Sequence, residues 1–138
     1  MAFASSSQPL FDRLQKLRTS WPARAFSWDS RLIGVTSSFS VEFEGKARVA
    51  ARDAFPVEYN ALTITKATPQ LRALAERTGG LRAGQLLLSS TDPGPLVPFG
   101  LWWPWGDGMT TSFRFGLDGL DWNDDPYPKM RDVFGVAM

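Results

Sequence analysis

Cysteine and histidine are both absent from this chain of 138 residues. Without cysteine, disulfides, thiolate nucleophiles and metal sites with thiolate ligands are excluded. Without histidine, the chain lacks the usual general base at neutral pH and the commonest metal ligand. Catalysis would have to use carboxylates, lysine or tyrosine, and no spacing of these groups indicates a reaction. We therefore expect a protein that is not an enzyme and that has neither a cofactor nor a metal site.

Long apolar runs are missing too, because no window approaches the roughly 18 apolar residues of a membrane span. The first residues, MAFASSSQPLFDRL, contain no basic stretch followed by an apolar one, so they do not resemble a secretory signal. These two observations predict a cytoplasmic protein with no membrane partner.

Net charge is low, at +1, which argues against a dedicated nucleic-acid binder. The charge is nevertheless uneven. Residues 1–82 carry twelve Lys and Arg against seven Asp and Glu, whereas residues 83–138 carry three against seven. Such a polar molecule suits an electrostatically complementary partner, or a fold in which the two halves face each other.

Aromatic residues are plentiful, with ten Phe, six Trp and two Tyr. With 43% hydrophobic and 21% charged residues, the composition is typical of a globular protein. The length fits one domain, residues 1–138, in which residues 1–6 form a flexible end.

Two helices are indicated by their periodicity and their ends. Over residues 8–18, apolar side chains recur on one helical face, at Leu10, Phe11, Leu14 and Leu17. Over residues 68–78, Thr68-Pro69 is a strong start and Gly79-Gly80 a strong stop.

Five strands are predicted, near residues 32–43, 46–52, 59–66, 85–90 and 109–117. The first two form a hairpin about Glu44-Gly45, because apolar and polar residues alternate on both sides of that turn. The fold class is therefore α+β: a single domain in which an approximately five-stranded, mostly antiparallel sheet packs one face against the two helices.

The most unusual stretch, PLVPFGLWWPWGDGMTTSFRFGL, spans residues 95–117 and contains Trp102, Trp103 and Trp105. Tryptophans spaced by proline can form a rigid binding platform for a partner's side chains or for a sugar ring. The alternative is that these rings cover the core. Because Trp102 and Trp103 are adjacent, an extended chain directs them to opposite sides, so at least one should lie near the surface. Gly106-Asp107-Gly108 is interpreted as a hairpin turn.

A second candidate site is the acidic tail, with Asp121, Trp122, Asp124 and Asp125. Its spacing partly matches a calcium loop, but Pro126 occupies the position where glycine must make the sharp turn, so we expect no metal. Carboxylates around an aromatic residue suit the docking of a basic partner, and a solvated acidic loop is the alternative.

These observations favour a non-enzymatic protein-binding module, such as an adaptor or a small inhibitor or immunity-type protein that engages a basic partner. The alternative hypothesis is a small-ligand or carbohydrate-binding domain that uses the Trp102–Trp105 segment. The candidate binding residues are Trp102, Trp103, Trp105, Asp121, Trp122, Asp124 and Asp125.

Overall fold

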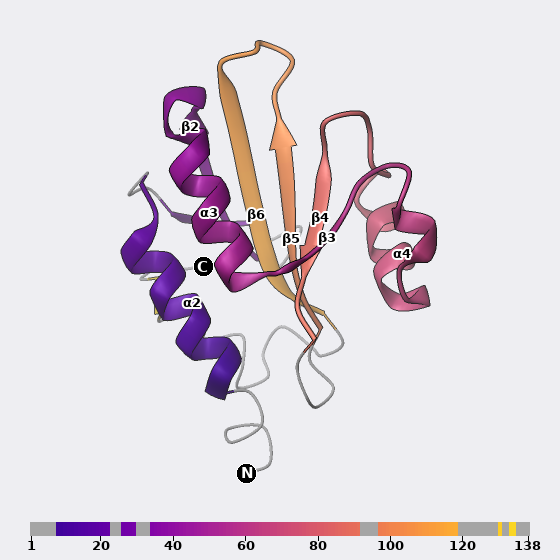
Figure 1. Cartoon of the computed structure of the whole chain (residues 1–138), viewed down its shortest axis with the longest axis horizontal. Coiled ribbons are helices and arrows are strands. Elements are labelled where there is room, and N and C mark those ends of the chain that lie inside the picture. Colours follow the sequence, from indigo (N-terminus) through magenta and orange to yellow (C-terminus); the bar gives the residue numbers. More distant parts are fainter. Residues whose placement is uncertain are drawn as a thin grey trace.

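The protein is an α+β single domain built on one antiparallel sheet, as the computed structural model shows (Figure 1). The structure describes residues 8–22, 26–29, 34–91, 97–118, 130 and 133–134. Within these residues, six strands pair in the order β1-β2-β6-β5-β4-β3, and every neighbouring pair is antiparallel. The strands are β1 (Ser27–Asp29), β2 (Gly34–Ser40), β3 (Val57–Tyr59), β4 (Leu86–Ser89), β5 (Val97–Pro104) and β6 (Thr110–Asp118).

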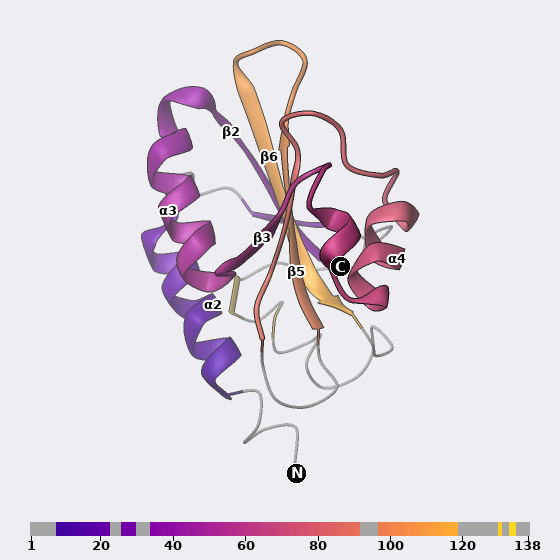
Figure 2. The same cartoon turned by 45° about the vertical axis from the view of Figure 1, so that its right-hand side comes forward.

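Helices cover both faces of this sheet (Figures 1 and 2). The helices are α2 (Gln8–Ser20), α3 (Glu44–Ala54) and α4 (Pro69–Arg77), with 3₁₀ turns η1 (Val41–Phe43) and η2 (Ile64–Lys66). Of the helices in the described ranges, none is long and apolar enough to cross a membrane.

The larger core lies between the sheet and the pair α2 and α3. Helix α2 buries the apolar face that its sequence predicts, including Leu10, Leu14 and Leu17. Helix α3 contributes only small buried side chains, namely Ala47, Ala50, Ala51 and Ala54. Aromatic side chains of the sheet, among them Phe113 and Phe115, fill the remaining space.

One glycine makes room for this aromatic core. A Cβ atom at Gly100 would lie 2.6 Å from the Phe113 ring, which is far closer than van der Waals contact permits. The register partner of Gly100 on β6 is Phe115, not Phe113. The Phe113 ring must therefore lean diagonally across β5 to reach Gly100. The core therefore depends on the missing side chain at position 100.

The smaller core lies on the opposite face, under α4. Thr68 caps this helix, since its hydroxyl oxygen accepts a hydrogen bond from the Leu71 N–H, and Pro69 follows in the first turn. Gly79 and Gly80 end the helix with positive φ angles of 102° and 79°. Both predicted ends are confirmed. Helices α2 and α4 do not share a face, however, so the expectation that one face carries both helices is wrong.

The predicted strand over residues 46–52 is also wrong, because these residues belong to α3. The alternation of Ala47, Val49 and Ala51 suggested a strand. Alanine is the best helix former, and Ala47, Ala50, Ala51 and Ala54 recur at helical spacing, so the helix buries all four. Val49 points to solvent, with 60% of its surface exposed.

Two further strand boundaries differ from prediction. Strand β2 ends at Ser40, whose hydroxyl caps η1, and the chain then turns at Val41. The predicted strand over 59–66 is reduced to β3, because Asn60 starts a tight turn. The Asn60 carboxamide oxygen accepts hydrogen bonds from the N–H groups of residues 62 and 63, at 2.9 Å each. Strands near 85–90 and 109–117 are confirmed.

Candidate interaction surface

Trp102 lies inside the protein. It occupies β5, faces α3 and is 2% exposed. Its ring packs 5.5 Å from the Phe39 ring and 6.0 Å from the Phe113 ring, between centroids. The Arg48 guanidinium lies 5.5 Å from the Trp102 ring centroid and pairs with Glu58. Trp102 therefore joins α3 to the sheet, and its ring is not accessible to a partner.

The environment of Arg48 is partly desolvated. Burial lowers the pKa of the Arg48 guanidinium below its usual value, and the positive charge of Arg52 lowers it further, while Glu44 opposes the shift. Arginine still remains charged at neutral pH. The pair with Glu58 and the contact with Trp102 offset part of this desolvation, while Nη1 of Arg48 is buried with no hydrogen-bond partner among the described residues.

Trp103 points to the other side of β5, as adjacent residues of a strand must. It is half-buried beside the smaller core, and the Arg114 guanidinium lies 5.2 Å from its ring centroid. The indole Nε1 is buried and has no hydrogen-bond partner among the residues that the structure describes. One face of the Trp103 ring is thus already covered by a cation, so this ring is less accessible to a partner than an open one would be.

Trp105 is the exposed member of the three, with 51% of its surface accessible. It follows the last residue of β5 and opens the turn to β6. The backbone N–H of Trp105 donates to the Thr110 carbonyl oxygen at 2.7 Å, which closes the hairpin. The predicted turn at Gly106-Asp107-Gly108 is confirmed, and Gly108 has a φ of +69°.

Asp107 organises this turn. Its Oδ1 accepts hydrogen bonds from the backbone N–H groups of Met109, at 2.8 Å, and Thr110, at 3.0 Å. Its Oδ2 accepts from the Thr110 hydroxyl at 3.0 Å. The hydrogen bond from Met109, followed by those from Thr110, lowers the pKa of Asp107 below its usual value. The turn that carries Trp105 is therefore pre-organised.

Exposed apolar residues occur both in this turn and in the segment that pairs with it. Backbone pairing continues past β2, because the Val41 N–H donates to the Met109 carbonyl oxygen at 2.8 Å. Two chain segments therefore meet here, and each carries two exposed large hydrophobic residues, namely Val41 and Phe43 in η1 and Trp105 and Met109 in the turn. We call these four residues the hairpin end. Figures 1 and 2 show the β5–β6 connection projecting beyond the helices at one end of the molecule.

The charges next to the hairpin end are mostly negative. Glu42 and Glu44 flank Phe43 in the chain, and Asp107 lies in the turn. Lys46, which is exposed in the first turn of α3, is the cation closest in sequence.

Sequence reasoning placed Trp105 at this site but missed its neighbours. Val41 and Phe43 fall within the predicted strand over residues 32–43, where the alternation favours burial, yet they are 41% and 39% exposed. Met109, at 67% exposed, was read as the start of a strand. Val41 and Phe43 lie in η1, after the end of β2 at Ser40, and Met109 lies in the turn before β6.

The acidic tail cannot be placed in the same way. Asp121, Trp122, Asp124 and Asp125 lie outside the described residues, as does the predicted flexible end at residues 1–6. Across the ranges that the structure describes, no group of three or more metal-ligating carboxylates occurs.

A search for similar proteins gives no further guidance. No protein-family model, curated protein or solved structure matches the chain.

Proposed function

We propose that this chain is a non-enzymatic protein-binding module whose contact surface is the hairpin end. The observation that carries the proposal is that η1 and the β5–β6 turn, which meet through the Val41–Met109 backbone hydrogen bond, carry four exposed large apolar residues, one of them a tryptophan. Such exposed apolar groups with a polar surround are typical of interaction sites. Tryptophan is also enriched among the residues that dominate binding energy.

The rigidity of the turn supports this role. Asp107 accepts hydrogen bonds from the backbone N–H groups of Met109 and Thr110 and from the Thr110 hydroxyl, so the turn loses little conformational entropy when a partner packs on Trp105. A pre-organised loop that presents an aromatic side chain is a common means of recognition.

The partner that we propose is a protein with a basic surface beside an apolar contact. Glu42, Glu44 and Asp107 favour a basic partner by electrostatic steering. The acidic tail, with Asp121, Asp124 and Asp125, would strengthen the same preference.

Site-specific photocrosslinking in the native cell tests this proposal. A photoreactive phenylalanine analogue replaces Trp105 in one strain and Leu62 in a control strain. Leu62 is the matched control because it is 84% exposed but lies in the Asn60 turn. We expect one protein to crosslink at position 105 and not at position 62. The purified partner is then titrated against the wild-type chain and against Asp121→Asn/Asp124→Asn/Asp125→Asn.

Each outcome has a separate meaning. If the triple variant binds the partner more weakly than the wild type, the acidic tail belongs to the interface. If the affinity is unchanged, the acidic tail is not part of the interface. Absence of any specific crosslink at position 105 would contradict the proposal.

The alternative is small-ligand or carbohydrate binding by the tryptophans of residues 102–105. It has less support, because Trp102 is sealed in the core and Trp103 is half-buried under Arg114. Trp105 alone would have to supply the open ring face.

A further inference from the structure

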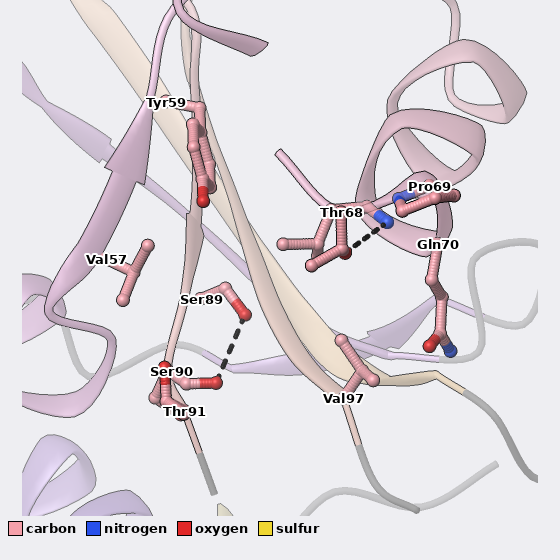
Figure 3. A pocket seen from close by; sticks show the side chains of 10 residues that line it. Val57, Tyr59, Thr68, Pro69, Gln70, Ser89, Ser90, Thr91 and Val97 are labelled. Carbon is pink, nitrogen blue, oxygen red and sulfur yellow. Dashed lines mark hydrogen bonds between the residues drawn. The ribbon is translucent and has the colours of Figure 1, made fainter. Parts of the chain in front are cut away.

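A separate cavity lies at the opposite end of β5. It opens between the ends of β3, β4 and β5 and the first turn of α4, and its volume is about 520 Å³ (Figure 3). This volume lies within the range of small-molecule sites, roughly 300–1,000 Å³. Val97 lines it at the start of β5, whereas the hairpin end follows the last residue of that eight-residue strand. At about 3.3 Å per residue, roughly 25 Å separate the two places.

Hydroxyl groups dominate the polar part of the lining, with Tyr59, Thr68, Ser89, Ser90 and Thr91. Figure 3 shows the Tyr59 hydroxyl directed into the space between Ser89 of β4 and Thr68 at the start of α4. Ser89 is fixed, because its hydroxyl donates to the Pro98 carbonyl oxygen at 2.6 Å. In the described part of the chain, the Tyr59 and Thr91 hydroxyls have no hydrogen-bond partner.

The start of α4 adds further donors and acceptors. The Thr68 oxygen accepts a hydrogen bond from Leu71, which leaves its own proton to donate. The Gln70 N–H lies in the first helical turn and has no acceptor within the helix. The Gln70 side chain is held by Asp118, at 3.2 Å between Nε2 and Oδ2, so its carboxamide oxygen is left as an acceptor.

Apolar groups make up the rest of the wall, and no charged side chain lines the cavity among the described residues. Val57, Val97 and the Tyr59 ring provide this apolar surface. The nearby Asp118 carboxylate already pairs with Arg77. The Arg13 guanidinium donates to the Ser90 hydroxyl at 2.9 Å and to the Ala54 carbonyl oxygen, and it does not line the cavity. A charged ligand would therefore lose hydration here without direct contact with a counter-charge, whereas a neutral ligand needs none.

We infer that this cavity binds a neutral, polyhydroxylated small molecule of sugar size. Sugar hydroxyls both donate and accept, and so can pair with the hydroxyls of Tyr59, Thr68 and Thr91. The C–H face of the ring would pack on Val57, Val97 and Tyr59. This site is independent of the hairpin end and of the protein partner proposed there.

Backbone amide NMR titration tests the inference on the full chain. The probes are glucose, galactose, ribose and myo-inositol. Glucose 6-phosphate serves as the anionic comparator and cyclohexanol as the comparator with a single hydroxyl. We expect saturable shifts with at least one of the four neutral probes, confined to residues 57–59, 68–71 and 89–91.

Three variants make the test specific. Tyr59→Phe and Thr91→Val each remove one hydroxyl with little change of shape, and each should weaken binding about threefold to tenfold. Thr65→Val, at an exposed threonine outside the cavity, should leave the affinity unchanged. Spectra of the free variants check that each one is folded.

Several results would overturn the inference. One is the absence of saturable shifts with all four neutral probes. Another is equal or tighter binding of either comparator. A third is binding that neither Tyr59→Phe nor Thr91→Val weakens.

Discussion

The backbone N–H of Val41 donates to the carbonyl oxygen of Met109 at 2.8 Å. This bond continues the pairing of β2 with β6 beyond Ser40 and Thr110, the last register pair of the two strands. It therefore places η1 against the β5–β6 turn. Exposed apolar residues that lie far apart in the sequence become neighbours at the hairpin end, which is the basis of the proposed function.

The three clustered tryptophans should contribute very differently to stability. Trp105→Ala should change the free energy of unfolding by less than about 0.5 kcal/mol, because the side chain is half exposed beyond the strand. Trp102→Ala should cost about 3–5 kcal/mol, since it leaves a large cavity next to Phe39 and Phe113. Urea unfolding followed by circular dichroism measures both. Equal effects of the two changes would contradict the placement of these residues.

The Asp107 carboxylate should titrate at a lower pH in the folded chain than in the unfolded chain. Its pKa is lowered by hydrogen bonds that the charged form accepts from Met109 and Thr110. The stabilisation is therefore fully present above the unfolded pKa of about 3.9 and is lost as the pH falls through the folded pKa. Carboxyl ¹³C NMR measures the midpoint, and Thr110→Val, which removes one donor, should raise it. A folded midpoint at or above the unfolded one would refute the turn geometry.

A buried hydrogen bond between Trp21 and Ser37 should stabilise the larger core. The indole Nε1 donates to the Ser37 hydroxyl oxygen at 3.0 Å, and both residues are buried. Ser37→Ala leaves the indole N–H without a partner and should cost about 1–3 kcal/mol. In the Trp21→Phe background the same change should cost clearly less, which a double-mutant cycle in urea measures. Purely additive effects would argue against the bond.

Gly100→Ala should destabilise the fold although it adds only a methyl group. The new Cβ would meet the Phe113 ring at 2.6 Å, in a region where Phe55 is also close, so the core must shift. Overpacking of this kind costs roughly 1–3 kcal/mol. Gly45→Ala is the matched control, because nothing lies within 4 Å of its added Cβ and it sits in helix α3, where alanine is favoured. A Gly100→Ala protein as stable as the wild type would show that Phe113 does not lean over β5.

The fold class and several elements could be predicted from the sequence where the local signals are strong. Thr68-Pro69 and Gly79-Gly80 mark both ends of α4, and the alternation of Phe113, Phe115 and Leu117 predicts β6. Helix α3 was missed because its buried face consists of alanines. Alanine differs little in hydrophobicity from many exposed residues, so the pattern fits the two-residue period of a strand as well as the helical period. The distribution of helices over two faces depends on long-range packing that no local pattern encodes.

The candidate site could be predicted only in part, and for a related reason. Trp105 was among the candidate binding residues, and it directly precedes the glycine-rich turn that the sequence predicts. Val41 and Phe43 carry the same alternating pattern as the buried residues of β2, and only the 3₁₀ turn after Ser40 exposes them. The hydroxyl-lined cavity joins residues from β3, β4, β5 and α4, which the sequence alone does not bring together.

The central claim is that the hairpin end binds a protein partner through Trp105. Isothermal titration calorimetry tests it most directly. The purified partner, identified by crosslinking at position 105, is titrated with the wild-type chain, with Trp105→Ala and with the control Leu62→Ala. A tryptophan that dominates an interface is worth about 2 kcal/mol or more, so Trp105→Ala should weaken binding roughly thirtyfold while Leu62→Ala stays within about twofold of the wild type. Equal affinities for the wild type and Trp105→Ala, with both proteins equally folded, would contradict the account.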